Sequence, residues 1–187
     1  MSKHHMLGIQ TLGSKPGCVI LEFALCHFLN ESDDRKHFEI VKPTIRHARI
    51  GIKSQMKAGA TIEHDTLKWW VDTNPLRLRD MMNDEYAETP YFTAKWFEES
   101  VVWENANIWV RDWDFEYPLM DDFFTRFGTP GKHIWKFSHK RCHQFLLKFA
   151  GVEFTPATNT HSAVADVETR IENTIETLRL LLPHKFT

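Results

Sequence analysis

The stretch "HHMLGIQTLGSKPGCVILEFAL", residues 4–25, contains two apolar runs that are separated by turn-forming residues. The runs extend over residues 5–10 and 18–28, and the segment "TLGSKPG" lies between them. Glycine and proline supply the backbone conformations that a reversal of chain direction requires. The stretch therefore predicts a β-hairpin at the start of the fold.

The rest of the chain alternates between strand and helix patterns. Residues 37–41 predict a third strand that ends at Pro43, and residues 106–110 predict a buried strand. Apolar spacing, caps and prolines predict helices at residues 61–74, 75–84, 89–100, 119–127, 142–149 and 161–182. A hairpin followed by alternating helices and strands predicts an α/β fold, with a mixed sheet of about five strands and helices on both sides.

Composition limits the class of protein. A chain of 187 residues with 42% hydrophobic residues predicts one domain over residues 1–187, since no linker or repeat divides it. The net charge of -2 excludes a generally basic surface, so nucleic acid would have to bind at a local patch. Three cysteines without metal-ligand spacing are typical of reduced thiols. With no apolar stretch of membrane-spanning length, we expect a soluble cytoplasmic protein.

Four segments, in order, resemble the motifs of a known family. The hairpin is similar to the motif D-x-E-T-x-G of the DEDDh 3′–5′ exonucleases. It most resembles the form D-x-E-T-L-G-x-x-P-x-x-V-I of a mycobacterial and phage exoribonuclease-like group, which includes the phage DNA exonuclease A. The matching residues are Thr11, Leu12, Gly13, Pro16, Val19 and Ile20. "DTLKWW" (65–70), "IWVRDWDFEYPLMDDFFTRFG" (108–128) and "HSAVAD" (161–166) resemble the later motifs.

The resemblance implies a ribonuclease H-like fold and a metal-dependent site. In that family four carboxylates hold two divalent ions, and a histidine acts as the general base. The matching positions of this chain are Gly8, Gln10, Glu116, Asp166 and His161. Two of the four acids are thus replaced by a glycine and a neutral amide, and the third is a glutamate in place of an aspartate.

Fewer acids mean weaker metal binding. Mg²⁺ prefers anionic oxygen ligands in a near-octahedral arrangement, and no carboxylate is left to bridge two ions. We therefore expect at most one weakly held Mg²⁺ or Mn²⁺, at Glu116 and Asp166. Asp114 is a further candidate ligand because it would share the face of Glu116 in a strand-like stretch.

Nucleic-acid contacts are expected at the first motif and at a basic cluster. Thr11 and Leu12 lie in the motif, and Lys140 and Arg141 belong to "HKRCH". Cationic side chains of this kind are typical phosphate ligands. Most of the seven tryptophans have the spacing of core residues, so they do not by themselves predict base stacking.

Three functions are compatible with these residues. The first is a catalytically degenerate exonuclease homologue, of phage type, that binds single-stranded nucleic acid or a protein partner. The second is an active 3′–5′ exonuclease, on DNA or RNA, that uses Asp114, Glu116, Asp166 and His161 around a single metal ion. The third is a protein–protein interaction or inhibitor module on the exonuclease fold. A homodimer is compatible with each of them.

Overall fold

Five strands form one mixed sheet in the order β3-β2-β1-β4-β5. The computed structural model describes residues 1–101, 105–132, 135–155 and 161–186. Their strands are β1 (Ser2–Thr11), β2 (Ile20–Glu31), β3 (Phe38–Arg49), β4 (Ala106–Val110) and β5 (Lys140–Cys142). β2 pairs antiparallel with both β1 and β3, whereas β4 is parallel to β1 and to β5. The predicted hairpin and mixed sheet are confirmed.

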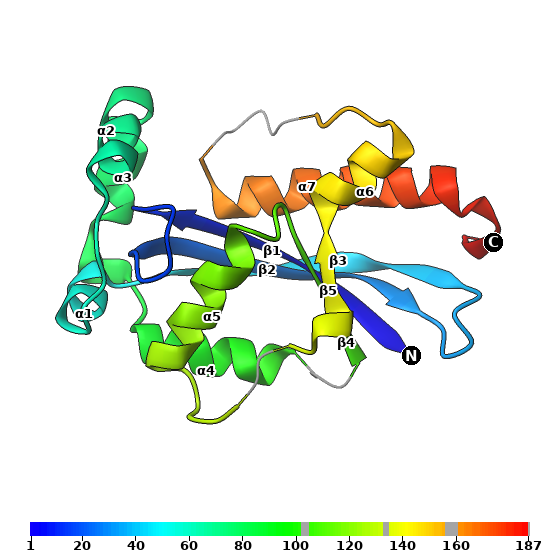
Figure 1. Cartoon of the computed structure of the whole chain (residues 1–187), viewed down its shortest axis with the longest axis horizontal. Coiled ribbons are helices and arrows are strands. Elements are labelled where there is room, and N and C mark those ends of the chain that lie inside the picture. The colour runs from blue at the N-terminus through cyan, green and yellow to red at the C-terminus, as the bar shows by residue number, and fades with distance from the viewer. Residues whose placement is uncertain (102–104, 133–134, 156–160, 187) are drawn as a thin grey trace.

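Helices cover both faces of the sheet (Figure 1). The helices are α1 (Ile52–Lys57), α2 (His64–Thr73), α3 (Pro75–Met81), α4 (Pro90–Ser100), α5 (Glu116–Phe127), α6 (His143–Ala150) and α7 (Ala163–Leu181), with the short turns η1 (Asp84–Tyr86), η3 (Phe137–His139) and η4 (Pro183–Lys185). α4 and α5 lie on one side, and α6 and α7 lie on the other. None of the described helices is long and apolar enough to cross a membrane.

Several helices begin where the sequence predicts. The side chain of Asn74 accepts a hydrogen bond from the backbone of Arg77 at the start of α3, and Thr89 caps α4 in the same way. Such caps satisfy backbone N–H groups that have no partner inside the helix. α6 ends at Gly151, whose φ of 67° is a left-handed conformation that glycine adopts at little cost.

The central strand β1 divides the core in two. Leu7 and Ile9 pack with the residues of α4 and α5, whereas Met6 packs with those of α7. Successive side chains of a strand point to opposite faces, so positions 6, 8 and 10 all face α7. This alternation brings Gly8 and Gln10 against the last helix of the chain.

The third strand is longer than predicted. The sequence interpretation ended it at Pro43, but β3 continues to Arg49. Leu29 pairs with Ile40 and His27 pairs with Thr44, so β3 bulges between these two pairs. Proline is tolerated there because β3 is an edge strand, where a missing backbone donor interrupts no inner ladder. The short elements α1 and β5 were not predicted.

Candidate functional site

A cleft of about 240 Å³ lies where β1 and β4 end. Ligand sites of sheets with parallel strands commonly lie outside the carboxyl ends of those strands. β1 contributes Gln10 and Thr11, α2 contributes Trp69 and Trp70, and α7 contributes Asp166 and Arg170. The turn before α5 adds Arg111 and Phe115, and Glu116 begins that helix. The structure thus brings Gln10, Glu116 and Asp166 to one place.

Gln10 binds directly to Asp166. The Gln10 Nε2 atom donates a hydrogen bond to Asp166 Oδ2 over 2.8 Å, which joins β1 to α7. Two carboxylates at these positions would repel each other unless a cation lay between them. An amide removes one charge and supplies a donor, so this contact requires no metal ion.

Arg170 occupies the centre of the acidic site. Its Nη1 atom donates to Glu116 Oε1 over 2.8 Å and to the Leu7 carbonyl over 3.1 Å, and its Nη2 atom lies 3.6 Å from Asp166 Oδ2. Arg170 and Glu116 are only 5% and 2% exposed. The guanidinium therefore acts as a fixed internal cation between the two remaining acids.

The partners of Glu116 favour the ionised form of its buried carboxyl group. Burial raises the pKa of its carboxyl group, and the Arg170 charge and a hydrogen bond from the Asp112 N–H act against this rise. The Asp112 nitrogen lies 2.7 Å from Glu116 Oε2. A buried carboxylate with several donors is tolerated, whereas an unpaired one is not.

Gly8 leaves no room for an acid. A Cβ atom at this position would lie 2.8 Å from the Ala163 carbonyl oxygen and 2.8 Å from Val167 Cγ2. Real Cβ atoms do not approach other atoms so closely. α7 therefore occupies the space that a side chain at position 8 would need, and part of the contact is with backbone.

The residues present do not fit a pair of metal ions. Among the described parts of the chain, no group of three or more His, Cys, Asp or Glu side chains is arranged as a metal site. Asp166 is bonded to Gln10, and Glu116 is bonded to Arg170. A bridging carboxylate cannot be accommodated at Gly8 without movement of α7. The positive charge that such a site takes from metal ions comes here from a guanidinium.

Glu22 fixes the start of α7 over the sheet. This fully buried side chain on β2 accepts a hydrogen bond from the Ala163 N–H over 3.1 Å. His47 Nε2 lies 3.4 Å from Glu22 Oε1, and Arg77 forms an ion pair with the same oxygen. Burial acts to raise the pKa of Glu22, but these partners outweigh it and hold the pKa below its usual value. A carboxylate at a helix N-terminus also stabilises the helix.

His161 lies directly before α7 and against the aromatic wall of the cleft. Its ring makes edge-to-face contacts with those of Trp69 and Trp70, at interplanar angles of 85° and 69° and centroid distances of 4.8 and 5.5 Å. Its φ of 73° is in the left-handed region, which is uncommon for a residue other than glycine. Trp70 is itself held by a hydrogen bond from its Nε1 atom to the Thr11 carbonyl. The packing of two tryptophans thus maintains the unusual backbone at His161.

Three of the predicted contacts are placed differently from expectation. Residues 113–115 form a turn rather than a strand, so the exposed Asp114 does not share the face of the buried Glu116. Leu12 is completely buried and packs with Trp70, which excludes its side chain from ligand contact. Thr11 lines the cleft, but its hydroxyl is buried and donates to the Gly13 carbonyl over 2.6 Å.

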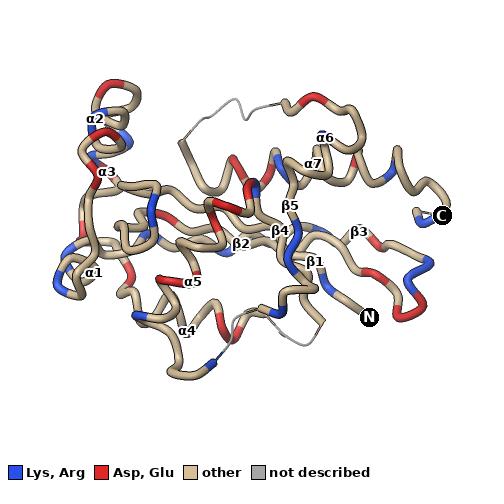
Figure 2. The backbone as a smooth tube through the Cα atoms, in the orientation of Figure 1, with Lys and Arg blue, Asp and Glu red and all other residues tan. Residues whose placement is uncertain are grey.

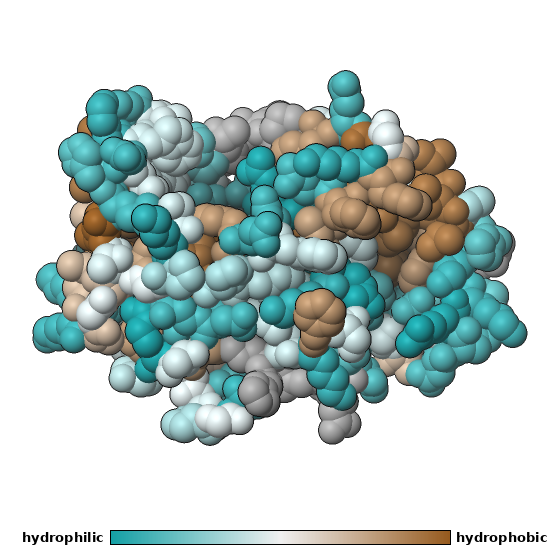
Figure 3. Space-filling view, viewed as in Figure 1, coloured by the Kyte–Doolittle hydropathy of each residue, from teal (hydrophilic) through white to brown (hydrophobic). Residues whose placement is uncertain are grey.

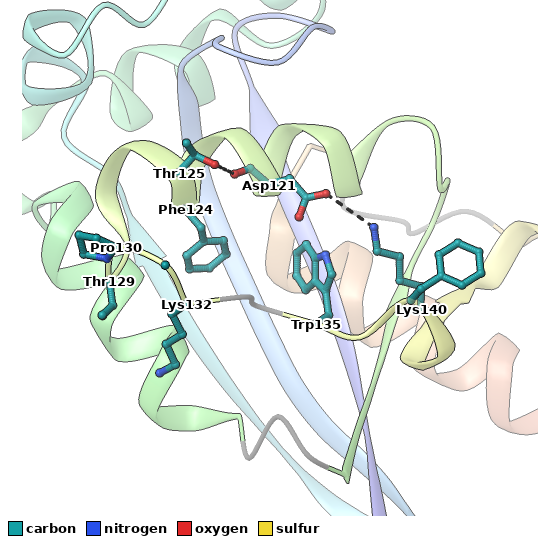
Figure 4. Close-up of a pocket in the computed structure, with 10 residues that line it drawn as sticks. Asp121, Phe124, Thr125, Thr129, Pro130, Lys132, Trp135 and Lys140 are labelled. Carbon is teal, nitrogen blue, oxygen red and sulfur yellow. Dashed lines mark hydrogen bonds and ion pairs between the residues drawn. The ribbon is translucent and has the colours of Figure 1, made fainter.

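Lys140 and Arg141 lie on β5, at the edge of the sheet (Figure 2). Neither residue lines the cleft at the end of β1. Lys140 Nζ lies 3.6 Å from Asp121 Oδ2 and 5.8 Å from the centre of the Trp135 ring. Figure 4 shows Lys140 pointing toward the Asp121 carboxylate. Any phosphate contact of these two residues is therefore separate from the cleft.

Arg170 is the residue of the cleft that the sequence interpretation missed. The signal was present, since Arg170 follows Asp166 by four residues on α7 and lies within the buried stripe that includes Val167 and Ile171. An arginine within the apolar stripe of a helix becomes buried, and a buried arginine is normally paired with an acidic side chain. The identity of that acid depends on the position of α5.

A hairpin-led mixed sheet, with a cleft built from β1, α5 and α7, is the architecture of the ribonuclease H-like 3′–5′ exonucleases. Residues 3–176 match the 3′-5′ exoribonuclease Rv2179c-like domain, so the chain belongs to that family. This confirms its assignment to the DEDDh-type exonuclease superfamily. None of the curated proteins matches the chain.

Solved structures of exonuclease I share the fold. The Escherichia coli enzyme in complex with a dT13 oligonucleotide is 13% identical, with a TM-score of 0.63 over 98% of this chain and 42% of that one. Exonuclease I from Methylocaldum szegediense is also 13% identical and has a TM-score of 0.63. The match covers 98% of this chain and 41% of that one. Exonuclease I in a complex with the C-terminal peptide of SSB is 12% identical and has a TM-score of 0.60. The match covers 100% of this chain and 43% of that one. The chain spans about two fifths of these proteins, and the likeness concerns the fold alone.

Proposed function

We propose that this protein is a catalytically degenerate 3′–5′ exonuclease that binds single-stranded nucleic acid in the cleft without hydrolysing it. The observation that supports the proposal is the Arg170 guanidinium, which binds Glu116 and Asp166 in place of metal ions. Phosphoryl transfer in this class of enzyme depends on two ions that stabilise the attacking and the leaving oxygen. A guanidinium held inside the protein cannot activate a water molecule, so the chemistry is lost.

Binding can persist without this chemistry. Glu116 and Asp166 are offset by Arg170, so the cleft does not present uncompensated acids to a phosphate. Arg111 adds a cation at the wall of the cleft, and Trp69 is 46% exposed there. A cation beside an exposed aromatic ring is the usual combination for a nucleotide of a single strand. Exonuclease I, which shares the fold, has been crystallised with single-stranded DNA.

A nuclease assay tests the loss of activity. The wild-type protein, His161→Ala and the exposed-residue control His184→Ala are incubated with 5′-labelled single-stranded DNA and RNA in Mg²⁺ or Mn²⁺. We expect the same intact oligonucleotide on the gel for all three proteins. Shortening from the 3′ end by the wild type and by His184→Ala, but not by His161→Ala, would establish an active enzyme and contradict the proposal.

A binding assay tests the role of Arg170 as the cation. Fluorescence anisotropy measures the affinity for a labelled oligonucleotide in EDTA and in Mg²⁺ at equal ionic strength. We expect equal affinities within about twofold, because the charge of the site is balanced without metal, whereas ionic strength itself has a large effect. Binding that EDTA abolishes would show that the cleft requires a metal ion after all.

A further inference from the structure

Four exposed aromatic side chains lie along the β5 edge of the sheet. Phe149 and Phe145 on α6 are 73% and 61% exposed, Trp113 in the turn before α5 is 47% exposed, and Phe137 in η3 is 89% exposed. We call these four residues the β5-edge row. Figure 3 shows the hydrophobic surface gathered over α6 on this face of the molecule.

The rings of the row are nearly parallel where they meet. The Trp113 and Phe145 centroids are 6.1 Å apart with an interplanar angle of 15°, and those of Phe145 and Phe149 are 6.4 Å apart at 18°. The phenylalanine pairs of the core instead meet at larger angles, such as 53° between Phe23 and Phe97. Rings stacked in this way leave their outer faces and edges exposed to a ligand.

A pocket of about 440 Å³ lies at one end of the row, with Trp113 and Phe137 in its wall. Tyr117 and Pro118 of α5 also line it, and Lys140 and Arg141 approach from β5. Its lining is mainly apolar carbon, but it has charged groups at the rim. These dimensions and this lining suit a planar ring next to an anionic group.

The charged groups of this pocket come from two elements, and Lys140 of one forms an ion pair with Asp121 of the other, over 3.6 Å. Lys140 and Arg141 belong to β5, whereas Asp114 and Asp121 belong to α5 and the turn before it. Lys140 also lies 4.6 Å above the Tyr117 ring. The cationic side fits a phosphate, and the carboxylates can accept hydrogen bonds from the amino groups of a base.

The row is continuous with the cleft through the turn between β4 and α5. Arg111 and Phe115 of this turn line the cleft, and Trp113 between them lines the pocket. The cleft and the pocket thus share one turn, and a strand that crosses this turn would reach the Trp113 ring. An isolated protein-docking patch would not require this connection to the cleft.

We propose that the β5-edge row stacks the bases of a single-stranded nucleic acid whose end lies in the cleft, and that Lys140 and Arg141 contact its phosphates. The inference rests on the proposed function, and it adds a second binding surface outside the exonuclease cleft. Aromatic rings next to cations bind single strands with little sequence preference, because each base has a stacking face.

Substitution of the row tests the proposal. Anisotropy is measured with a short oligonucleotide that fills only the cleft and with a longer one that also reaches the row. Trp113→Ala and Phe137→Ala should each weaken binding of the longer strand by about 5- to 150-fold, the usual range for loss of one stacked base. Both variants should leave the short strand unchanged. The control is Tyr86→Ala in η1, which removes a ring of 72% exposure outside the row.

Salt dependence tests the cationic side. Lys140→Ala should reduce the slope of log K against log salt by about 0.7 for the longer strand, since one phosphate contact is lost. The control Lys95→Ala on α4 should leave the slope unchanged.

The possible failures are distinguishable. If Trp113→Ala and Phe137→Ala bind the longer strand as tightly as Tyr86→Ala does, the inference about the row is wrong. In that case weaker binding by the cleft variant Trp69→Ala would still support the proposed function. If the wild-type protein binds neither strand, both proposals are wrong.

Discussion

The cleft at the end of β1 and the β5-edge row differ in whether their side chains have partners inside the protein. In the cleft Gln10, Asp166, Arg170 and Glu116 bind one another, so the site is closed by internal contacts. In the row the four aromatic side chains are 47% to 89% exposed. The cleft is stable without a ligand, whereas the row gains stability only when something covers it.

The difference follows from the energetics of charge and of apolar surface. Buried acids that lose their cations destabilise a protein by several kcal/mol unless another positive group takes their place. Exposed rings carry no such penalty, and each Å² that a ligand covers contributes only about 25 cal/mol. The buried acids of the cleft therefore need the Arg170 charge inside the fold, whereas the aromatic surface can remain open.

The largest expected effect comes from breaking the internal contacts of the cleft. Arg170→Ala should lower the free energy of unfolding by about 3–5 kcal/mol, because it leaves Glu116 buried without its cation. The control Arg179→Ala, an exposed arginine of the same helix, should cost less than about 1 kcal/mol. Urea unfolding followed by circular dichroism measures both.

A double variant sharpens this test. Arg170→Met combined with Glu116→Gln removes both charges but keeps an acceptor for the Asp112 N–H, so it should recover most of the loss. Equal stability of Arg170→Ala and the wild type would mean that Arg170 is not the cation on which the cleft depends.

A second effect concerns the space at Gly8. Gly8→Ala should destabilise the protein by about 1–3 kcal/mol, because the added carbon meets both α7 backbone and Val167. Gly8→Asp should cost more, since it adds a charge to the same crowded position. An acid at position 8 would therefore not rebuild a metal site by itself.

A mutant cycle isolates the steric cause. Val167→Ala shortens one of the two groups that a side chain at position 8 would meet. The double variant should therefore lose less unfolding free energy than the sum of the losses in Val167→Ala and Gly8→Ala. Strict additivity of the two unfolding free energies would show that Val167 does not oppose a side chain at position 8.

A further effect, which accumulates over several pH units, is a pH dependence of the unfolding free energy that links α6 to the core. The pKa values of His5 and His143 are lowered to about 3, mainly by burial, and for His143 the charges of Arg170 and Arg111 contribute to this value. Between pH 6.5 and about 3 the unfolded chain binds protons that the folded protein does not. Stability should therefore decrease as the pH falls through this range, by about 1.4 kcal/mol per pH unit for each histidine.

His143→Gln should remove its share of this slope. Unfolding free energies of the variant and of the control His184→Gln are compared at a series of pH values between the two limits. An unchanged slope in His143→Gln would exclude this residue as a source of the pH dependence.

Local pattern was sufficient for most of the fold. The hairpin, the buried strand Ala106–Val110 and the long helix α7 follow from turn residues and apolar spacing, and the structure confirms them. The continuation of β3 beyond Pro43 was not predictable in this way. A proline is tolerated there only because no further strand pairs with that edge, which is a property of the assembled sheet.

The predicted site was partly local and partly not. The motifs brought Gln10, Glu116 and Asp166 together, and the structure joins Gln10 to Asp166 as the resemblance implies. Asp114 was misjudged because a turn, not a strand, precedes α5. Lys140 and Arg141 could not be separated from the cleft by sequence, since the distance between β5 and β1 is set by the strand order.

The sequence by itself determined the family and showed a glycine and an amide at positions 8 and 10, because a motif is read position by position. Only the tertiary structure decided which groups surround Glu116 and Asp166. Arg170 is 163 residues from Leu7 and 54 from Glu116 along the chain, yet it donates hydrogen bonds to both. The closeness of α7 to Gly8 and the alignment of the β5-edge row arise in the same way. Helical spacing fixes which face a residue occupies, but packing of distant segments fixes what that face meets.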